Sequence, residues 1–222
     1  GQNRTGSIVL IRDVTELRRQ EQELITKDAT IREIHHRVKN NLQTVASLLR
    51  IQSRRSKNDE VRETLDQAMR RVTAIALVHD TLSEGTAQEL NFDEVFDRVL
   101  LLTAEVATEH NTSVNTIIDG KFGQLPGAIA TPLAVALTEI VANAVEHGLG
   151  ERSGAVHVNA ERKAKKLEIT VSDNGRGLTD GKVGDGLGTQ IIRTLIEGEL
   201  RGAINWFSPP DGGTKVSISI PL

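Results

Sequence analysis

The chain has 222 residues, of which 26% are charged, and its formal net charge of −3 gives no basic surface for direct binding of nucleic acid. It contains no cysteine, which excludes disulfides and thiolate metal sites. We find no apolar run close to the length of about 20 residues that spans a bilayer, and no secretory signal opens the sequence. These features favour a cytoplasmic protein, or a cytoplasmic part of one.

The first 16 residues predict a single strand at 7–11, within "GQNRTGSIVLIRDVTE". A lone strand cannot bury its own apolar face. We therefore interpret residues 1–16 as the remnant of an upstream domain.

Residues 17–83 have the pattern of two long helices separated by the polar segment 53–60. Apolar residues recur every seven positions in the first helix and at three- or four-residue spacing in the second. These positions are Leu17, Leu24, Ile31, Val38 and Val45, followed by Val61, Leu65, Met69, Val72, Ala76 and Leu82. A single hairpin cannot bury both apolar seams, so we expect a homodimeric four-helix bundle through residues 17–83, within a helical domain at 17–86.

Residues 87–222 mix strand and helix patterns. Alternating apolar residues predict strands at 113–118, 155–160, 167–173, 203–207 and 214–220. Helical patterns lie at about 92–110, 132–147 and 188–197. The order predicts an α/β two-layer sandwich, with one sheet covered by helices.

The segment "LTEIVANAVEHG" (137–148) places an acid, an amide and an imidazole at four-residue spacing, as Glu139, Asn143 and His147. On a helix these three side chains form one polar ridge. Such a ridge can hold a hydrated cation and phosphate oxygens, because Mg²⁺ takes one or two protein oxygens together with phosphates.

The segment "LEITVSDNGRGL" (167–178) places Asp173 on the same strand face as the apolar residues before it. A carboxylate directed into an apolar layer is costly unless a donor meets it, and the exocyclic amine of adenine is such a donor. Gly175 and Gly177 would let the backbone approach the base closely.

The segment "GDGLGTQII" (184–192) brings Gly184, Gly186 and Gly188 before an apolar helix. Free N–H groups at such a loop suit phosphate. Each segment alone is more often a turn or a solvated helix face, but the three together in this order predict a nucleotide site. The chain has neither a P-loop nor a Rossmann fingerprint.

These three segments resemble the Bergerat-fold ATPase domain, which histidine kinases share with anti-sigma serine kinases, gyrase-type topoisomerases and related chaperones. The resemblance implies ATP and Mg²⁺ as ligands of residues 87–222. It implies that Asn143 is a Mg²⁺ ligand, with Glu139 acting through water, and that His147 faces phosphate. The closing "GGTKVSISIPL" resembles the last strand of this family, with Thr214 near adenine.

The stretch "IREIHHRVKNNLQ" (31–43) resembles the H-box of the HisKA_2 subfamily of two-component sensor histidine kinases, and within it an actinobacterial type. With the ATPase segments, the resemblance covers residues 17–222, and "GSIVLIRDVTE" resembles the end of a PAS sensor domain. It implies autophosphorylation of a histidine and transfer to an aspartate of a response regulator. In this subfamily the regulator often has an RNA-binding antitermination output.

Helix periodicity separates the two adjacent histidines. With Ile31 on the apolar seam and a turn of about 100° per residue, His35 lies about 40° from the seam and His36 about 140° from it. We therefore expect His35 at the edge of the bundle and His36 outside it. The family motif, in which the acceptor precedes arginine, also implies that His36 is the phosphoacceptor.

Two further roles remain open at this point. Arg37 stands where the more widespread kinase branch has an acid, so Glu33 or Glu139 would have to act as the base. Asn40, four residues after His36, could position water for dephosphorylation. Two other functions also remain: an ATP-binding regulator that phosphorylates a partner's hydroxyl group, and a dimeric scaffold with a silent ATP site.

Overall fold

The computed structural model describes residues 12–84, 89–109, 114–150, 153–178 and 181–222, with side-chain surroundings given for all of these except 102–109. The strand expected at 7–11, and with it most of the segment likened to a PAS domain, lies outside the described residues.

The N-terminal part is a helical hairpin, as the apolar repeats predict. Helix α1 (Thr15–Arg55) and helix α2 (Asp59–Glu84) are antiparallel neighbours. The connection is shorter than the predicted break at 53–60, because α1 continues to Arg55 and α2 begins at Asp59. The side-chain oxygen of Asn58 accepts a hydrogen bond from the N–H of Glu60 at 2.9 Å, which caps the start of α2.

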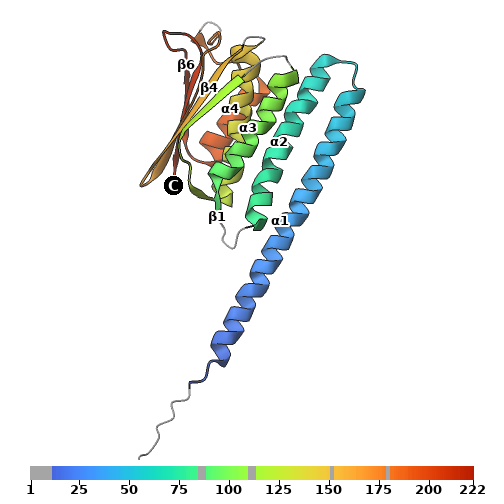
Figure 1. The fold of residues 1–222 in the computed structure, drawn as a ribbon, viewed down its shortest axis with the longest axis vertical. Coiled ribbons are helices and arrows are strands. Elements are labelled where there is room, and N and C mark those ends of the chain that lie inside the picture. Colours follow the sequence, from blue (N-terminus) through green and yellow to red (C-terminus); the bar gives the residue numbers. More distant parts are fainter. Residues whose placement is uncertain (1–11, 85–88, 110–113, 151–152, 179–180) are drawn as a thin grey trace, which may run out of the picture.

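Helix α1 extends well past the end of α2, as Figure 1 shows. Residues 15–34 are exposed throughout. Apolar side chains of the heptad seam and its neighbours are therefore uncovered in the single chain. Those at least two-fifths exposed on α1 are Leu17, Leu24, Ile25, Ile34, Val45, Leu48 and Ile51.

The second part is an α/β sandwich. Its elements are, in order, β1 (Glu89–Asn91), α3 (Phe92–Glu109), β2 (Val114–Gly120), β3 (Gln124–Pro126), α4 (Gly127–Asn143), the π-helical turn η1 (Ala144–Leu149), β4 (Gly154–Lys163), β5 (Lys166–Asp173), α5 (Leu187–Arg193), the π-helical turn η3 (Thr194–Glu199), β6 (Ala203–Phe207) and β7 (Lys215–Pro221).

The five-stranded sheet has the order β2-β4-β5-β7-β6, in which β2 and β4 are parallel and the other pairs antiparallel. Helices cover one of its faces, and α2 of the hairpin packs on α3 and α4 from the other side of that helical layer (Figure 1). All five predicted strands are present within a few residues. The short antiparallel pair β1–β3 was not predicted.

Helix α4 is the centre of the core, and its residues 132–142 are all buried. Together with η1 it forms the one helix among the described residues (Gly127–Leu149) that is long and apolar enough to cross a membrane, contrary to the sequence expectation. Its most apolar window is 78% buried inside the protein, as in the core helix of a globular domain.

Candidate functional site

A cavity of about 680 Å³ lies where α4, η1, β5, β7 and the start of α5 meet. It brings together the three polar segments and the closing strand that the sequence singled out, whose lining residues lie up to 75 residues apart in the chain (Glu139 to Thr214). The predicted residues that line it are Glu139, Asn143, His147, Asp173, Gly177, Gly184, Gly186, Gly188 and Thr214. Gly175 lies next to the carboxylate of Asp173 but is not part of the lining.

Asp173 occupies the end of β5 and faces inward with its apolar neighbours, as strand alternation predicted. Its side chain is buried, and the N–H groups of Gly175 and Thr214 donate to its Oδ1 at 2.8 and 3.3 Å. Burial raises the pKa of this carboxyl, and the hydrogen bonds from Gly175 and Thr214 oppose that shift. A buried carboxylate held in this way in the wall of the cavity is a ready acceptor for an amine of a bound base.

The backbone packs around Asp173 too closely for side chains. A Cβ atom on Gly175 would lie 2.0 Å from the carbonyl oxygen of Gly148. Gly213, which has a positive φ of 77°, would place a Cβ atom 1.9 Å from the carbonyl oxygen of Asp173. Gly175 and Gly213 are therefore required by the close packing of the protein backbone around Asp173, while the approach of Gly175 and Gly177 to a base stays a prediction.

The glycines of the segment 184–192 lie in less crowded surroundings than those around Asp173. A Cβ atom on Gly184 or Gly186 would meet no other atom of the described residues within 4 Å, whereas one on Gly188 would lie 3.1 Å from Oε2 of Glu139. Of these three glycines, only Gly188 therefore lies in a tight contact, where α5 begins against α4.

Glu139 lies on the polar ridge of α4 but is only 3% exposed. Arg71 of α2 binds both of its carboxylate oxygens, with distances of 3.0 Å from Nε to Oε1 and 2.9 Å from Nη2 to Oε2. Asn143, one turn later, is half-buried, and His147 is exposed in η1. The acid of this ridge is therefore bound to Arg71 of the hairpin, while the exposed fraction of the side chains increases from Glu139 to His147.

A divalent cation suits the donors on this ridge, since Glu139 and Asn143 offer carboxylate and amide oxygens one turn apart within one cavity. Among the described residues no group of three His, Cys, Asp or Glu side chains could hold a metal ion alone. A cation here would therefore need additional oxygens from phosphate or water.

Several lining residues were missed by sequence reasoning. Gln67 comes from α2 of the hairpin, Arg176 and Lys182 bring positive charge near the glycine segments, and Trp206 comes from β6. Arg193 lies over the ring of Trp206, with 4.7 Å from its Cζ atom to the ring centroid. Their positions depend on tertiary packing, although the basic residues flanking the glycines are a signal that could have been noted.

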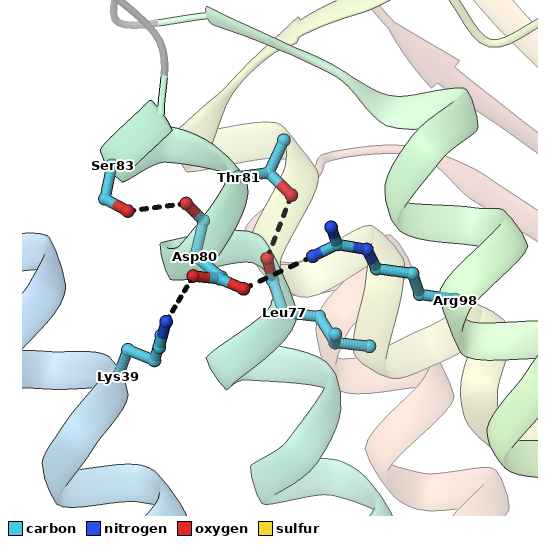
Figure 2. Close-up of polar contacts among 6 residues, drawn as sticks. All are labelled: Lys39, Leu77, Asp80, Thr81, Ser83 and Arg98. Carbon is cyan, nitrogen blue, oxygen red and sulfur yellow. Dashed lines mark hydrogen bonds and ion pairs between the residues drawn. The ribbon is translucent and has the colours of Figure 1, made fainter.

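The two adjacent histidines occupy the positions that periodicity predicted. His35 is half-buried against α2, where its Nδ1 lies 2.8 Å from Nδ1 of His79, and His36 is exposed. One turn later, Lys39 pairs with Asp80 of α2 at 2.5 Å, and Arg98 of α3 reaches the other oxygen of that carboxylate at 3.3 Å. Figure 2 shows Asp80 between these two cations, which links α1, α2 and α3.

The residues proposed for proton chemistry near His36 lie on the exposed surface of α1. Glu33 forms an ion pair with Arg37, with 3.4 Å between Oε1 and Nε, and both side chains are exposed. Asn40 is also exposed, on the same side of the helix as His36 because it follows by four residues.

The fold and cavity define a nucleotide-binding domain that follows a helical hairpin with an exposed histidine. Comparison with known families agrees. Residues 33–106 match the HisKA_2 family, described as histidine kinase, and residues 128–222 match the HATPase_c family, described as histidine kinase-, DNA gyrase B- and HSP90-like ATPase. The chain belongs to the histidine kinases, and its hairpin is of the HisKA_2 type.

Among proteins of known name, the chain is similar to the sensor histidine kinases PdtaS of Mycolicibacterium smegmatis (49% identical) and Mycobacterium tuberculosis (47% identical). Each match covers 98% of this chain but 44% of the relative, so the chain spans less than half of those proteins.

Two solved structures resemble this chain over different lengths. The histidine kinase domain of a blue-light-activated histidine kinase from Erythrobacter litoralis matches with a TM-score of 0.60 and 26% identity, over 90% of this chain and 94% of that one. The catalytic domain of the histidine kinase ThkA matches with a TM-score of 0.50 and 25% identity, over 60% of this chain and 94% of that one.

Proposed function

We propose that the chain is the kinase part of a cytoplasmic sensor histidine kinase that phosphorylates His36 from Mg·ATP. The observation that carries this proposal is the cavity lined by the buried carboxylate of Asp173, in a chain that also exposes His36 beside a helical seam. In this proposal residues 17–86 form the dimerisation and phosphotransfer domain, residues 87–222 bind ATP, and residues 1–16 end a PAS-like sensor domain.

The proposed contacts follow from the chemistry of the lining residues. Asp173, held by Thr214, accepts a hydrogen bond from the amine of adenine. Gly184, Gly186 and Gly188 leave backbone N–H groups near the phosphates. Asn143 and His147 extend toward the same phosphates from α4 and η1. A magnesium ion on Asn143, with Glu139 acting through water, would neutralise charge on the phosphate oxygens.

Phosphoryl transfer requires an uncharged ring nitrogen of His36 in line with the γ-phosphorus. A P–N bond forms as the bond to the β,γ-bridging oxygen breaks, and ADP leaves with that oxygen. The phosphoryl group then passes to an aspartate of a response regulator, which by analogy with the subfamily carries an RNA-binding antitermination output.

Within one chain, the packing of α2 on the ATP domain separates His36 from the cavity. Helix α2 lies between α1, which carries His36, and α4, which lines the cavity (Figure 1). The ATP domain must therefore leave α2 or act on the other chain of a dimer. The base, whether Glu33 or Glu139, would also have to leave its arginine partner.

Autophosphorylation with γ-labelled ATP and Mg²⁺ tests the proposal, with His36→Gln compared with wild type and with His35→Gln as the matched control. We expect an acid-labile label that only His36→Gln removes. An acid-stable label would instead indicate transfer to a hydroxyl group. Binding of ATP without any label would favour a silent scaffold.

A further inference from the structure

Two consecutive arginines of α2 hold two acids of the ATP domain. Arg70 binds Glu146 of η1, with 3.0 Å between Nη2 and Oε1, and Arg71 binds Glu139 of α4 through two parallel hydrogen bonds. All four side chains are at most 15% exposed. Both pairs are buried and the Arg71–Glu139 pair is bidentate, so removing one partner of either pair would leave a buried charge without its counterion.

The Arg71 contact involves the chemistry of the nucleotide site directly. Both oxygens of Glu139 are occupied by Arg71, while Oε2 also faces the backbone of Gly188 at the start of α5. Gln67, one turn before Arg71, lines the cavity itself. The hairpin thus forms part of the cavity wall and neutralises the acid closest to the proposed cation.

The interface between the hairpin and the ATP domain also contains an unpaired buried donor. Nε of Arg70 is buried and has no hydrogen-bond partner among the residues that the structure describes. A buried donor without a partner weakens the state that contains it. The interface therefore combines buried ion pairs with one unpaired buried donor, which reduces the free energy needed to separate the hairpin from the ATP domain.

We propose that Arg71 and a nucleotide-bound divalent cation compete for Glu139, so that docking of the hairpin holds the kinase inactive and Mg·ATP favours its release. This inference rests on the proposed function. Because such coupling is reciprocal, docking lowers the affinity for Mg·ATP by the same factor by which Mg·ATP lowers docking. Glu139 serves two partners in turn, and Arg71 is a positioning residue that acts through it.

Calorimetric titration of the full chain with ATP, in Mg²⁺ and in EDTA, separates this competition from a merely structural role. For Arg71→Ala we expect affinity for Mg·ATP to rise by about fivefold or more, as in typical couplings between sites. Affinity for metal-free ATP should change much less, because it lacks the cation that competes. Arg71→Lys, which keeps one cationic contact, should lie between wild type and Arg71→Ala.

Arg62→Ala is the matched control, since Arg62 lies on the same helix and its polar contacts are with neighbouring residues of the hairpin, Asp59 at 3.0 Å and the carbonyl oxygen of Ser56 at 3.3 Å. It should bind like wild type. Amide hydrogen exchange gives a second readout, in which Mg·ATP should speed exchange of the α2 segment around Arg71 in wild type, and less so in Arg71→Ala, which is already released.

Equal Mg·ATP affinities for wild type and Arg71→Ala would overturn the competition and leave the proposed function intact, as would equal changes with and without Mg²⁺. Failure of wild type and every folded variant to bind Mg·ATP would instead reject the proposed function, and the competition with it. Circular dichroism of each variant establishes that it is folded.

Discussion

Opposing effects act on the charge of Asp173. Burial raises its pKa above the ordinary value of 3.8, while the donors of Gly175 and Thr214 lower it. Because the pKa is raised in the folded state, the protonated carboxyl contributes to the free energy of unfolding below pH 3.8, and this contribution is lost as pH rises through the folded-state pKa. At neutral pH the ionised carboxylate therefore costs stability in the nucleotide-free chain, and a bound amine would offset that cost.

Asp173→Asn should separate binding from stability. We expect ATP affinity to fall by about tenfold or more, because a hydrogen bond to a charged group contributes roughly 1.5–3 kcal/mol. The nucleotide-free chain should be as stable as wild type at pH 7, or more stable, since a buried charge is removed. Calorimetry and chemical denaturation measure these two quantities. The affinity of wild type should also fall as pH is lowered through the raised pKa.

The control for this substitution is Asp119→Asn, because Asp119 is exposed in β2 and pairs with His157 at 2.6 Å, away from the cavity. Its ATP affinity should match wild type. Unchanged affinity in folded Asp173→Asn would contradict the assignment of this carboxylate to the base.

Local pattern predicted the direction of several side chains but not their partners. Strand alternation placed Asp173 inward, and helix periodicity placed His36 outward, because both depend on neighbours in the sequence. The pairing of Glu139 with Arg71 joins residues 68 apart and depends on how α2 packs on α4. The glycines looked alike in the sequence, yet Gly175 is sterically required and Gly184 is not.

At the scale of elements, His35 and His79 join α1 to α2 through their imidazoles, whose ring centroids are 5.1 Å apart. Burial lowers the pKa of both, and a neighbouring imidazole lowers each further, that of His36 for His35 and that of His35 for His79. Because both pKa values lie below the ordinary 6.5 in the folded state, the neutral imidazoles contribute to the free energy of unfolding above pH 6.5. This contribution is lost as pH falls through the folded-state pKa values.

We therefore predict that the chain loses stability as pH falls below 6.5 through the lowered pKa values, because the unfolded chain binds more protons in that window. His79→Gln should make this pH dependence shallower, since it removes one of the paired imidazoles. Chemical denaturation followed by circular dichroism at a series of pH values measures the effect. Equal slopes for wild type and His79→Gln would show that the pair does not control it.

The elements themselves followed the sequence where their period was long and regular. The hairpin, the five strands predicted between residues 113 and 220, and the helix that carries Glu139 are present, whereas the strand predicted at 7–11 lies outside the described residues. What the pattern did not show was the π-helical turn η1 after Asn143, and the pair β1–β3, which is only three residues long in each strand. Such short pairings are decided by tertiary contacts, which single-segment periodicity does not contain.

At the scale of the whole molecule, one chain leaves the apolar face of α1 uncovered. Val45 and Leu48 are 43% and 57% exposed, and the heptad seam continues through Leu24 into the part of α1 that extends past α2. A contiguous apolar face of this length on a helical hairpin is typical of an interface. A second copy of the chain would cover it with the same seam, which is the closed twofold arrangement of a four-helix bundle.

The double substitution of Val45→Asp and Leu48→Asp should convert a dimer into a monomer. Burying each aliphatic side chain contributes about 1.5–3 kcal/mol, and burying an aspartate there is unfavourable. Gln43→Asp with Ser47→Asp adds the same charge to exposed polar positions of α1 and should remain dimeric. Light scattering after size exclusion gives the mass of each. A monomeric wild type at micromolar concentration would reject the dimer, and His36 would then have to reach ATP within its own chain.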